Sequence, residues 1–270
     1  MHSVPPRNIL WEMSVFDING RHILVTGGSS GLGRHFARFL ANNGAHVTLA
    51  ARRAEALAAG VTEINGSGGK AQSIVLDVTI ADKVDGAMKE AEEKFGPIQA
   101  VVNNAGVTAT RSALEQDERA WDSVIDTNLK GVWLVAQTAA KRMIANNVKG
   151  SIVNIASILG LRVAGGVAPY AISKAGVVQM TKALALEWAR YGIRVNALAP
   201  GYFATELNDD FFEGESGKAL VKRIPQRRLG QLTELDGPLL LLISDAGSFM
   251  TGSVVTVDGC LLYTSPSPRD

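Results

Sequence analysis

Short apolar stretches alternate with longer amphipathic stretches along most of the chain. The apolar stretches are rich in Val, Ile and Leu and too short for helices, which predicts strands. Because strands and helices alternate, the pattern predicts an α/β fold with a doubly wound parallel sheet that has helices on both faces. The seven expected strands are 22–26, 46–51, 72–77, 100–102, 152–155, 194–198 and 254–257. The main expected helices are 34–43, 81–95, 121–126, 129–146 and 170–191.

Composition narrows the class of protein. With 270 residues, of which 46% are apolar, the chain can bury one substantial core, so we expect a single domain. A net charge of +1 gives no basic field for nucleic acid, and no stretch reads as a membrane span or signal core. We therefore expect a cytoplasmic protein that binds neither nucleic acid nor membrane. A single cysteine excludes an internal disulfide, and the four histidines lack metal-ligand spacing, so no metal site is expected.

Both ends of the chain depart from this pattern. The ending CLLYTSPSPRD does not continue the preceding strand pattern and resembles a translated sequencing adapter, so residues 260–270 are expected to be foreign. A natural disordered tail rich in Ser and Pro is the alternative. Residues 1–12 precede a plausible start at Met13 and are expected to be a non-native or disordered extension. The domain is then expected to span residues 13–259.

A glycine-rich turn follows the first expected strand and precedes an amphipathic helix. Such a turn lets backbone approach a pyrophosphate closely and points helix N–H groups toward it, so it predicts dinucleotide binding. A tight connection without a ligand is the alternative, since a lone glycine-rich turn is weak evidence. The residues expected to contact the cofactor here are Gly27, Ser29, Ser30, Gly31, Leu32 and Gly33.

The residues after the second expected strand indicate which dinucleotide binds. A fold of this kind that selects NAD usually carries an acidic residue here for the ribose 2′-OH. This chain has Arg52 and Arg53 instead, and arginine suits a 2′-phosphate through its planar fork of donors. The pair therefore favours NADP(H) over NAD(H). Two solvated surface arginines are the alternative.

Other expected strands also end in residues suited to a cofactor. Asp77 is placed to accept the adenine amino group, with Val78 against the ring, although Asp77 or Thr79 would also suit the N-cap of the next helix. Small residues and amides after further strands suit close backbone contact, and they include Asn104, Ala105, Gly106, Pro200 and Gly201. Ligands bind beyond the carboxyl ends of parallel strands, so these positions predict one shared site.

The candidate chemistry lies between residues 157 and 174. If the segment after Pro169 is helical, Tyr170 and Lys174 emerge from one face, one turn apart. An ammonium beside a phenol lowers the phenol pKa from about 10, which makes it a usable general acid/base at neutral pH. Ser157 follows a strand and faces the same crevice, where its hydroxyl can hold a carbonyl oxygen. Asn128 interrupts an apolar helix, so it either braces a bend or belongs to the site.

Taken in order, these motifs resemble those of the short-chain dehydrogenase/reductase family, over roughly residues 16–259. The match includes the glycine turn, Asn103-Asn-Ala-Gly106, Asn128, Ser157, Tyr170-Ala-Ile-Ser-Lys174 and Pro200-Gly201, and the spacing from Ser157 to Tyr170 is similar to that of 3-oxoacyl-[acyl-carrier-protein] reductases. The resemblance implies a single-domain Rossmann-type fold and a catalytic set of Asn128, Ser157, Tyr170 and Lys174.

The same resemblance implies a role for each residue. Tyr170 would be the general acid/base, Ser157 would orient the carbonyl, and Lys174 would bind the nicotinamide ribose and lower the Tyr170 pKa. Asn128 would hold a water in a proton relay. Phe203 and Thr205 would meet the nicotinamide carboxamide.

These observations predict an NADP(H)-dependent oxidoreductase that interconverts a ketone and a secondary alcohol. A 3-oxoacyl thioester is one possible substrate, and Arg227 and Arg228 would then face an acidic carrier protein. The alternatives are an NAD-dependent dehydrogenase of a sugar, polyol or steroid-like alcohol, and a non-catalytic NADPH-binding regulator. Residues 202–229 suit a lid over an apolar ligand.

Two further expectations concern packing. The helices expected at 129–143 and 175–188 are apolar on more than one face, which indicates a homotetramer like those usual in the family. Asp236 stands where related chains usually begin an apolar helical turn, which places the packing of that helix in question.

Overall fold

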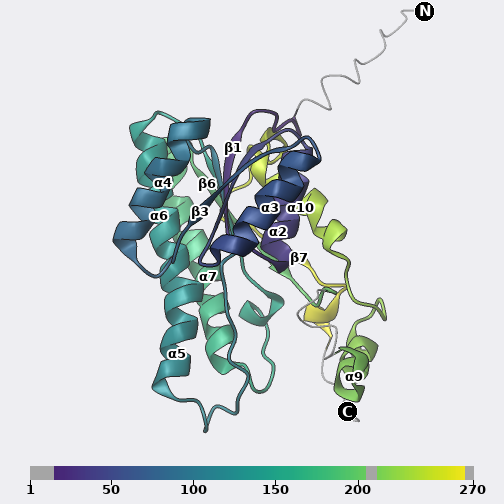
Figure 1. The fold of residues 1–270 in the computed structure, drawn as a ribbon. Coiled ribbons are helices and arrows are strands. Elements are labelled where there is room, and N and C mark those ends of the chain that lie inside the picture. Colours follow the sequence, from purple (N-terminus) through teal and green to yellow (C-terminus); the bar gives the residue numbers. More distant parts are fainter. Residues whose placement is uncertain (1–14, 205–211, 265–270) are drawn as a thin grey trace, which may run out of the picture.

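The computed structural model describes residues 15–204 and 212–264 and is built around one sheet of seven parallel strands. The strand order is β3-β2-β1-β4-β5-β6-β7, so the chain winds outward from β1 in one direction and then from β4 in the other (Figure 1). The predicted doubly wound α/β fold is confirmed. The strands are β1 His22–Thr26, β2 His46–Ala51, β3 Lys70–Val75, β4 Ala100–Asn103, β5 Ser151–Ile155, β6 Arg194–Pro200 and β7 Val254–Val257.

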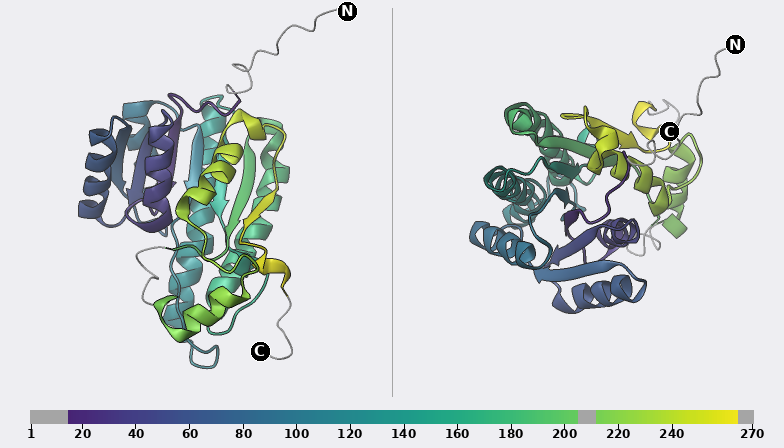
Figure 2. Two further views of the ribbon diagram at one scale, coloured as in Figure 1. Left: turned by 90° about the vertical axis from the view of Figure 1, so that its right-hand side faces the viewer. Right: turned by 90° about the horizontal axis from the view of Figure 1, so that it is seen from above.

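Helices cover both faces of the sheet (Figures 1 and 2). One layer holds α2 Gly31–Asn42, α3 Ala54–Gly66 and α10 Asp236–Ile243. The other holds α4 Ala81–Phe95, α6 Gly131–Ala145 and α7 Ala168–Trp188, with α5 Glu118–Ile125 against α7. The short helix α9 Glu215–Arg223 lies beyond the carboxyl ends of the strands.

Alternation along the strands explains the two layers. On β1, Ile23 and Val25 pack into the cluster that holds Phe36 and Leu40 of α2, while Leu24 packs into the cluster on the opposite face. All five of these side chains are buried. Since burying a side chain of this size contributes about 1.5–3 kcal/mol, strands with two apolar faces stabilise the sheet only when helices cover both.

Some element boundaries differ from the prediction. The third strand lies at Lys70–Val75 rather than 72–77, because its six residues pair one to one with the six of β2. The first helix begins at Gly31, inside the glycine turn, and not at residue 34. The sixth strand continues to Pro200, where it pairs with Val257.

Helix α10 forms with Asp236 as its first residue. An acidic group suits the first turn of a helix because it faces the positive end of the dipole. Asp236 also accepts a hydrogen bond from His35 Nε2 at 2.7 Å, so the residue that placed this helix in question ties α10 to α2. Burial raises the pKa of Asp236, while the hydrogen bond from His35 opposes that rise.

A closed polar network lies toward the amino ends of β1, β2 and β3. His22 is fully buried; its Nδ1 lies 2.7 Å from the Gly96 carbonyl and its Nε2 lies 2.8 Å from the Thr48 hydroxyl. Because a carbonyl only accepts, Nδ1 carries the proton and Nε2 accepts from Thr48. The Gln72 amide donates to Thr48 at 2.9 Å and to the Ala91 carbonyl at 2.9 Å.

Within the described part of the chain, no helix has both the length and the apolar character needed to cross a membrane.

Candidate active site

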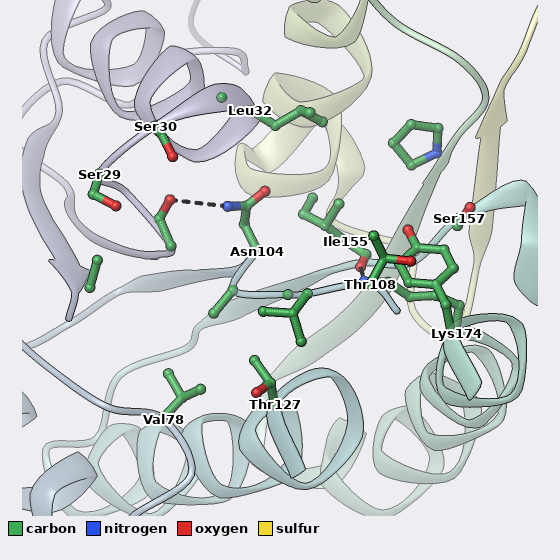
Figure 3. A pocket seen from close by; sticks show the side chains of 18 of the residues that line it. Ser29, Ser30, Leu32, Val78, Asn104, Thr108, Thr127, Ile155, Ser157 and Lys174 are labelled. Atoms are coloured by element: carbon green, nitrogen blue, oxygen red, sulfur yellow. Dashed lines mark hydrogen bonds between the residues drawn. The ribbon is translucent and has the colours of Figure 1, made fainter. Parts of the chain in front are cut away.

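A cleft of about 540 Å³ lies beyond the carboxyl ends of the strands, and it gathers most of the residues predicted for the site (Figure 3). The predicted residues that line it are Gly27, Ser29, Ser30, Gly31, Leu32, Arg52, Arg53, Asp77, Val78, Asn104, Ala105, Gly106, Ser157, Tyr170, Lys174, Pro200, Gly201 and Phe203. Gly33 and Asn128 lie behind the lining. Thr205 lies outside the described residues.

The glycine turn is shaped by close backbone packing. Gly27 has a φ of +66°, a region that favours glycine. A Cβ atom at Gly33 would lie 2.3 Å from the Gly27 carbonyl oxygen, which no side chain can tolerate without a shift of the turn. The turn therefore runs directly against α2, whose first residues, Gly31 and Leu32, line the cleft. The first N–H groups of a helix have no partner within it and suit an anionic ligand.

Asn104 holds this turn from the neighbouring strand. Its side-chain nitrogen donates to the carbonyls of Thr26 at 3.1 Å and Gly27 at 3.5 Å, and Figure 3 marks one of these hydrogen bonds. The Thr26 hydroxyl in turn accepts from the backbone N–H groups of Asn104 and Ala105. The loops after β1 and β4 are thus fixed to each other at the edge of the cleft.

The two arginines differ in position. Arg53 donates to the hydroxyls of Ser29 at 3.1 Å and Ser30 at 2.7 Å, so its guanidinium lies over the glycine turn. Arg52 is exposed, lines the cleft, and lies close enough to Asp77 to affect its ionisation. The two side chains place positive charge at the end of the cleft that holds the glycine turn.

Asp77 does not cap a helix. The N-cap of α4 is Ile80, and the Asp77 carboxylate instead accepts from the backbone N–H of Thr79 at 3.0 Å and from its hydroxyl at 2.8 Å. Burial raises the pKa of Asp77, but the hydrogen bonds from Thr79 and the charge of Arg52 bring it below its ordinary value. The N-cap alternative for Asp77 and Thr79 is therefore wrong, and an ionised Asp77 faces the cleft.

Ser157, Tyr170 and Lys174 meet at the other end of the cleft. Ser157 caps the short helical turn Ile158–Gly160, and its hydroxyl oxygen accepts from the Leu159 N–H at 3.1 Å. Tyr170 and Lys174 lie on the first turns of α7, which begins with Ala168 and Pro169. The predicted shared face is confirmed, since the Lys174 Nζ lies 5.6 Å from the centroid of the Tyr170 ring.

Lys174 is buried without a carboxylate beside it among the described residues. Its Nζ donates to the Ile155 carbonyl at 2.7 Å, which leaves two further N–H donors of the ammonium group toward the cleft that it lines. Burial lowers the pKa of Lys174 to about 8. The ammonium group is therefore mostly charged at pH 7 and loses its proton as the pH rises through about 8.

The predicted direction of the Tyr170 pKa is wrong for this structure. Burial raises the pKa of Tyr170, and the hydrogen bond with Ser157 opposes that rise only in part. Lys174 directs one of its N–H donors to the Ile155 carbonyl, and its positive charge does not offset the rise in the Tyr170 pKa that burial causes. Tyr170 therefore holds its proton at neutral pH, as a proton donor requires.

Asn128 lies in a π-helical turn, Asp126–Lys130, between α5 and α6. Its amide is fully buried and pairs with the backbone of Val107, accepting from the N–H at 2.8 Å and donating to the carbonyl at 2.8 Å. The side chain both braces the helix irregularity and lies directly behind the cleft lining. The two alternatives for Asn128 are therefore compatible.

Some lining residues were missed from the sequence. Tyr202, Thr108 and Thr127 also line the cleft. The position of Tyr202 directly after Pro200-Gly201 at a strand end was a usable signal. Thr108 and Thr127 carried none, because they lie in a loop and a helical turn whose course only the tertiary structure reveals. No cluster of three or more His, Cys, Asp or Glu in residues 15–204 and 212–264 is placed to hold a metal.

Comparisons with known proteins match this geometry. A family model described as short chain dehydrogenase matches residues 21–216. The chain is 39% identical to the gluconate 5-dehydrogenase of Gluconobacter oxydans, over 91% of this chain and 96% of that protein. It is also 39% identical to the 3-oxoacyl-[acyl-carrier-protein] reductase of Thermotoga maritima, over 91% of this chain and 99% of that protein.

A solved structure gives the same result. The gluconate 5-dehydrogenase of Burkholderia cenocepacia, crystallised with NADP and tartrate, superposes with a TM-score of 0.90 at 37% identity, and the match covers 94% of this chain and 100% of that one. With the fold, the cleft and these relatives in agreement, the chain belongs to the short-chain dehydrogenase/reductase family of oxidoreductases.

Proposed function

We propose that the protein is an NADP(H)-dependent oxidoreductase that interconverts a ketone and a secondary alcohol, with Tyr170 as the general acid/base. The observation that carries the proposal is the meeting of Ser157, Tyr170 and Lys174 at one end of a cleft whose other end is the glycine turn. Each of these residues lines the same cavity, although they come from two segments of the sequence.

The residues at the glycine end fit a dinucleotide phosphate. A Cβ at Gly33 has no room, the first residues of α2 line the cleft, and Arg53 donates to Ser29 and Ser30. Arg52 and Arg53 would hold a 2′-phosphate through charge-assisted hydrogen bonds, and Asp77 would accept from the adenine amino group. The two unused Lys174 donors would bind the nicotinamide ribose. When bound, the cofactor supplies the hydride.

The protein side of the chemistry then follows from the geometry. Ser157 and Tyr170 would hold the substrate oxygen between their hydroxyl groups, which lie within hydrogen-bonding reach of each other. Because the pKa of Tyr170 is raised, its proton would be retained until charge develops on that oxygen; its transfer would then convert the alkoxide to the alcohol and leave Tyr170 as the phenolate. In the oxidative direction, the phenolate form of Tyr170 would accept this proton.

One cofactor-site variant and one control test the choice of NADP(H). Replacing Arg53 by Ala removes a charge-assisted contact, so we expect the Kd for NADPH to rise by at least about tenfold while that for NADH changes little. Arg190→Ala is a suitable control, since the exposed Arg190 lies in the 3-10 turn after α7, does not line the cleft, and donates to the neighbouring Tyr191 hydroxyl. Equal loss of affinity for both cofactors in Arg53→Ala would favour an NAD-dependent enzyme.

The substrate is best sought among ketones of polyhydroxy acids and among 3-oxoacyl thioesters, the two classes that the relatives' names suggest. One observation favours the first class. Arg228, expected to face an acidic carrier, instead forms two hydrogen bonds of 2.7 Å with Glu234. We expect NADPH oxidation with 5-keto-D-gluconate to exceed that with an acetoacetyl thioester. If the protein reduces neither of these ketones and none in a wider panel, the result would favour the non-catalytic regulator.

We further propose that the protein is a homotetramer. A groove between α5, the π turn with α6, and α7 is lined by Ile125, Leu129, Lys130, Trp133, Met180 and Ala183, of which only Lys130 is charged. Trp133 is 40% exposed and Leu186 of α7 is 83% exposed, so a second copy would remove large apolar surface from water. Sedimentation at micromolar concentration tests this, and a monomer there would contradict it.

A further inference from the structure

Ser173 lies between Tyr170 and Lys174 on α7, but its side chain points away from the cleft lining into the buried layer behind it. Its hydroxyl donates to the Tyr170 carbonyl at 2.7 Å and accepts from the Asn128 amide nitrogen at 3.2 Å. A hydroxyl has one hydrogen, so the first bond fixes the direction of the second. Ser173 therefore links the helix of the general acid to the π turn.

Asn128 depends on this link for complete pairing. One hydrogen of its amide goes to the Val107 carbonyl and the other to Ser173, while its oxygen accepts from the Val107 N–H. The same oxygen lies 3.4 Å from the position that a Cβ of Gly106 would occupy, and the Lys174 Nζ lies 3.7 Å from that position. The Asn128 oxygen and the Lys174 ammonium thus flank one point beside the cleft.

We propose that Ser173 is a positioning residue that acts on turnover through Asn128. Loss of its hydroxyl leaves a buried N–H of Asn128 unpaired, which is costly enough to favour rearrangement of the π turn. Such a rearrangement moves the Asn128 oxygen relative to Lys174, and displacements of about 1 Å in an active site can cost about a hundredfold in rate. The inference rests on the proposed function.

The same helix contains a matched pair that has no contact with the cleft. Thr181 is fully buried, donates to the Val177 carbonyl at 2.8 Å, and accepts from the Asn154 amide at 2.9 Å. The two hydroxyls thus make the same two kinds of hydrogen bond on α7. Only the Ser173–Asn128 pair adjoins the cleft. A substitution at Thr181 therefore measures what a buried hydrogen bond of this kind contributes to stability alone.

The experiment compares Ser173→Ala, Thr181→Val, Asn128→Ala and the double variant Ser173→Ala/Asn128→Ala in the full chain, with kcat, KM, the Kd of NADPH and Tm measured for each. For Ser173→Ala we expect kcat to fall about tenfold while the Kd of NADPH changes less than about twofold. Thr181→Val should lower Tm to a similar extent and leave kcat unchanged. The double variant should match Asn128→Ala, because residues that act through one another are not additive.

An unchanged kcat in Ser173→Ala, an equal loss in Thr181→Val, or losses that multiply in the double variant would each overturn the inference. If Asn128→Ala does not fold, the comparison of Ser173→Ala with Thr181→Val still decides. Ser173→Cys, which keeps the size and a weaker donor, should give an intermediate kcat. A wild-type protein without ketone reduction would contradict the proposed function and this inference together, whereas active wild type with an equally active Ser173→Ala contradicts the inference alone.

Discussion

The two ends of the sheet use buried polar groups in opposite ways. Toward the amino ends of the strands, His22, Thr48 and Gln72 form a closed chain in which the donors and acceptors satisfy one another. At the carboxyl ends, the Lys174 ammonium directs one hydrogen bond to Ile155 and keeps two donors for the cleft. A closed network stabilises the fold, whereas a buried polar group with unused hydrogen-bond donors can bind a ligand.

The difference extends to the backbone. At the carboxyl ends, the glycine turn packs so closely on itself that Gly33 admits no side chain. Around His22 the polar side chains instead contact α4, through the Phe95 ring beside His22 and the Ala91 carbonyl that accepts from Gln72. Variants at the carboxyl ends should therefore change turnover and cofactor affinity, and variants at the amino ends should change stability.

The largest expected effect is on turnover in Tyr170→Phe. This change deletes the proton donor but keeps the ring, so kcat should fall by about a hundredfold to ten-thousandfold. The Kd of NADPH should change little, since Lys174 and the glycine turn are intact. Steady-state kinetics and NADPH fluorescence titration on the same preparation check both expectations. Retained turnover would remove Tyr170 from its role.

The next largest effect is on cofactor affinity in Gly33→Ala. The added methyl would lie 2.3 Å from the Gly27 carbonyl, so the turn must shift and NADPH affinity should fall by about tenfold or more. Gly86→Ala is the control, because Gly86 lies in α4, does not line the cleft, and its added methyl would meet nothing within 4 Å. Comparable Kd values for the two variants in fluorescence titration would show that the glycine turn does not hold the cofactor.

A smaller effect is expected from pH at Lys174. Its pKa is lowered to about 8, and the charged form exists below that value. The affinity for NADPH should therefore fall as pH rises through about 8, and the dependence should be absent in Lys174→Met. The Kd of NADPH measured between pH 6.5 and 9.5 tests this. An identical pH dependence in the variant would assign the titration to another group.

The smallest effect is on stability at His22. Burial lowers the pKa of His22 in the folded protein, whereas the unfolded chain titrates near 6.5. The unfolded state therefore binds more protons below pH 6.5, so stability should fall as pH falls below that value, by at most about 1.4 kcal/mol per pH unit from this group. His22→Asn should be less stable at pH 7 and show a shallower decline toward pH 5 in urea unfolding. Equal slopes in the two proteins would exclude His22 as the source.

Much of this arrangement was predictable from sequence. Apolar runs such as 22–26 and 152–155 revealed the strands, because a strand covered on both faces has no polar alternation to obscure it. Residues at strand ends, such as Gly27 and Ser157, could be located because they follow closely on these apolar runs. Their common location follows from parallel topology alone.

The remaining features depend on tertiary contacts. The pKa of Tyr170 was predicted in the wrong direction because helical spacing shows that Lys174 is near but not that both groups lose water. Asp77 pairs with Thr79 rather than capping α4, a choice between two local hydrogen bonds that sequence leaves open. The pair of His35 and Asp236 joins segments 201 positions apart, beyond any local pattern.

The most direct test of the central claim follows the transferred hydrogen. NADPH that carries deuterium at the transferable position of the nicotinamide is incubated with the protein and a ketone that it reduces, and the alcohol is analysed by mass spectrometry. Hydride transfer from the cofactor predicts one deuterium on the carbinol carbon, with the hydroxyl proton drawn from solvent through Tyr170. An alcohol without deuterium, or no alcohol with any ketone tested, would contradict it.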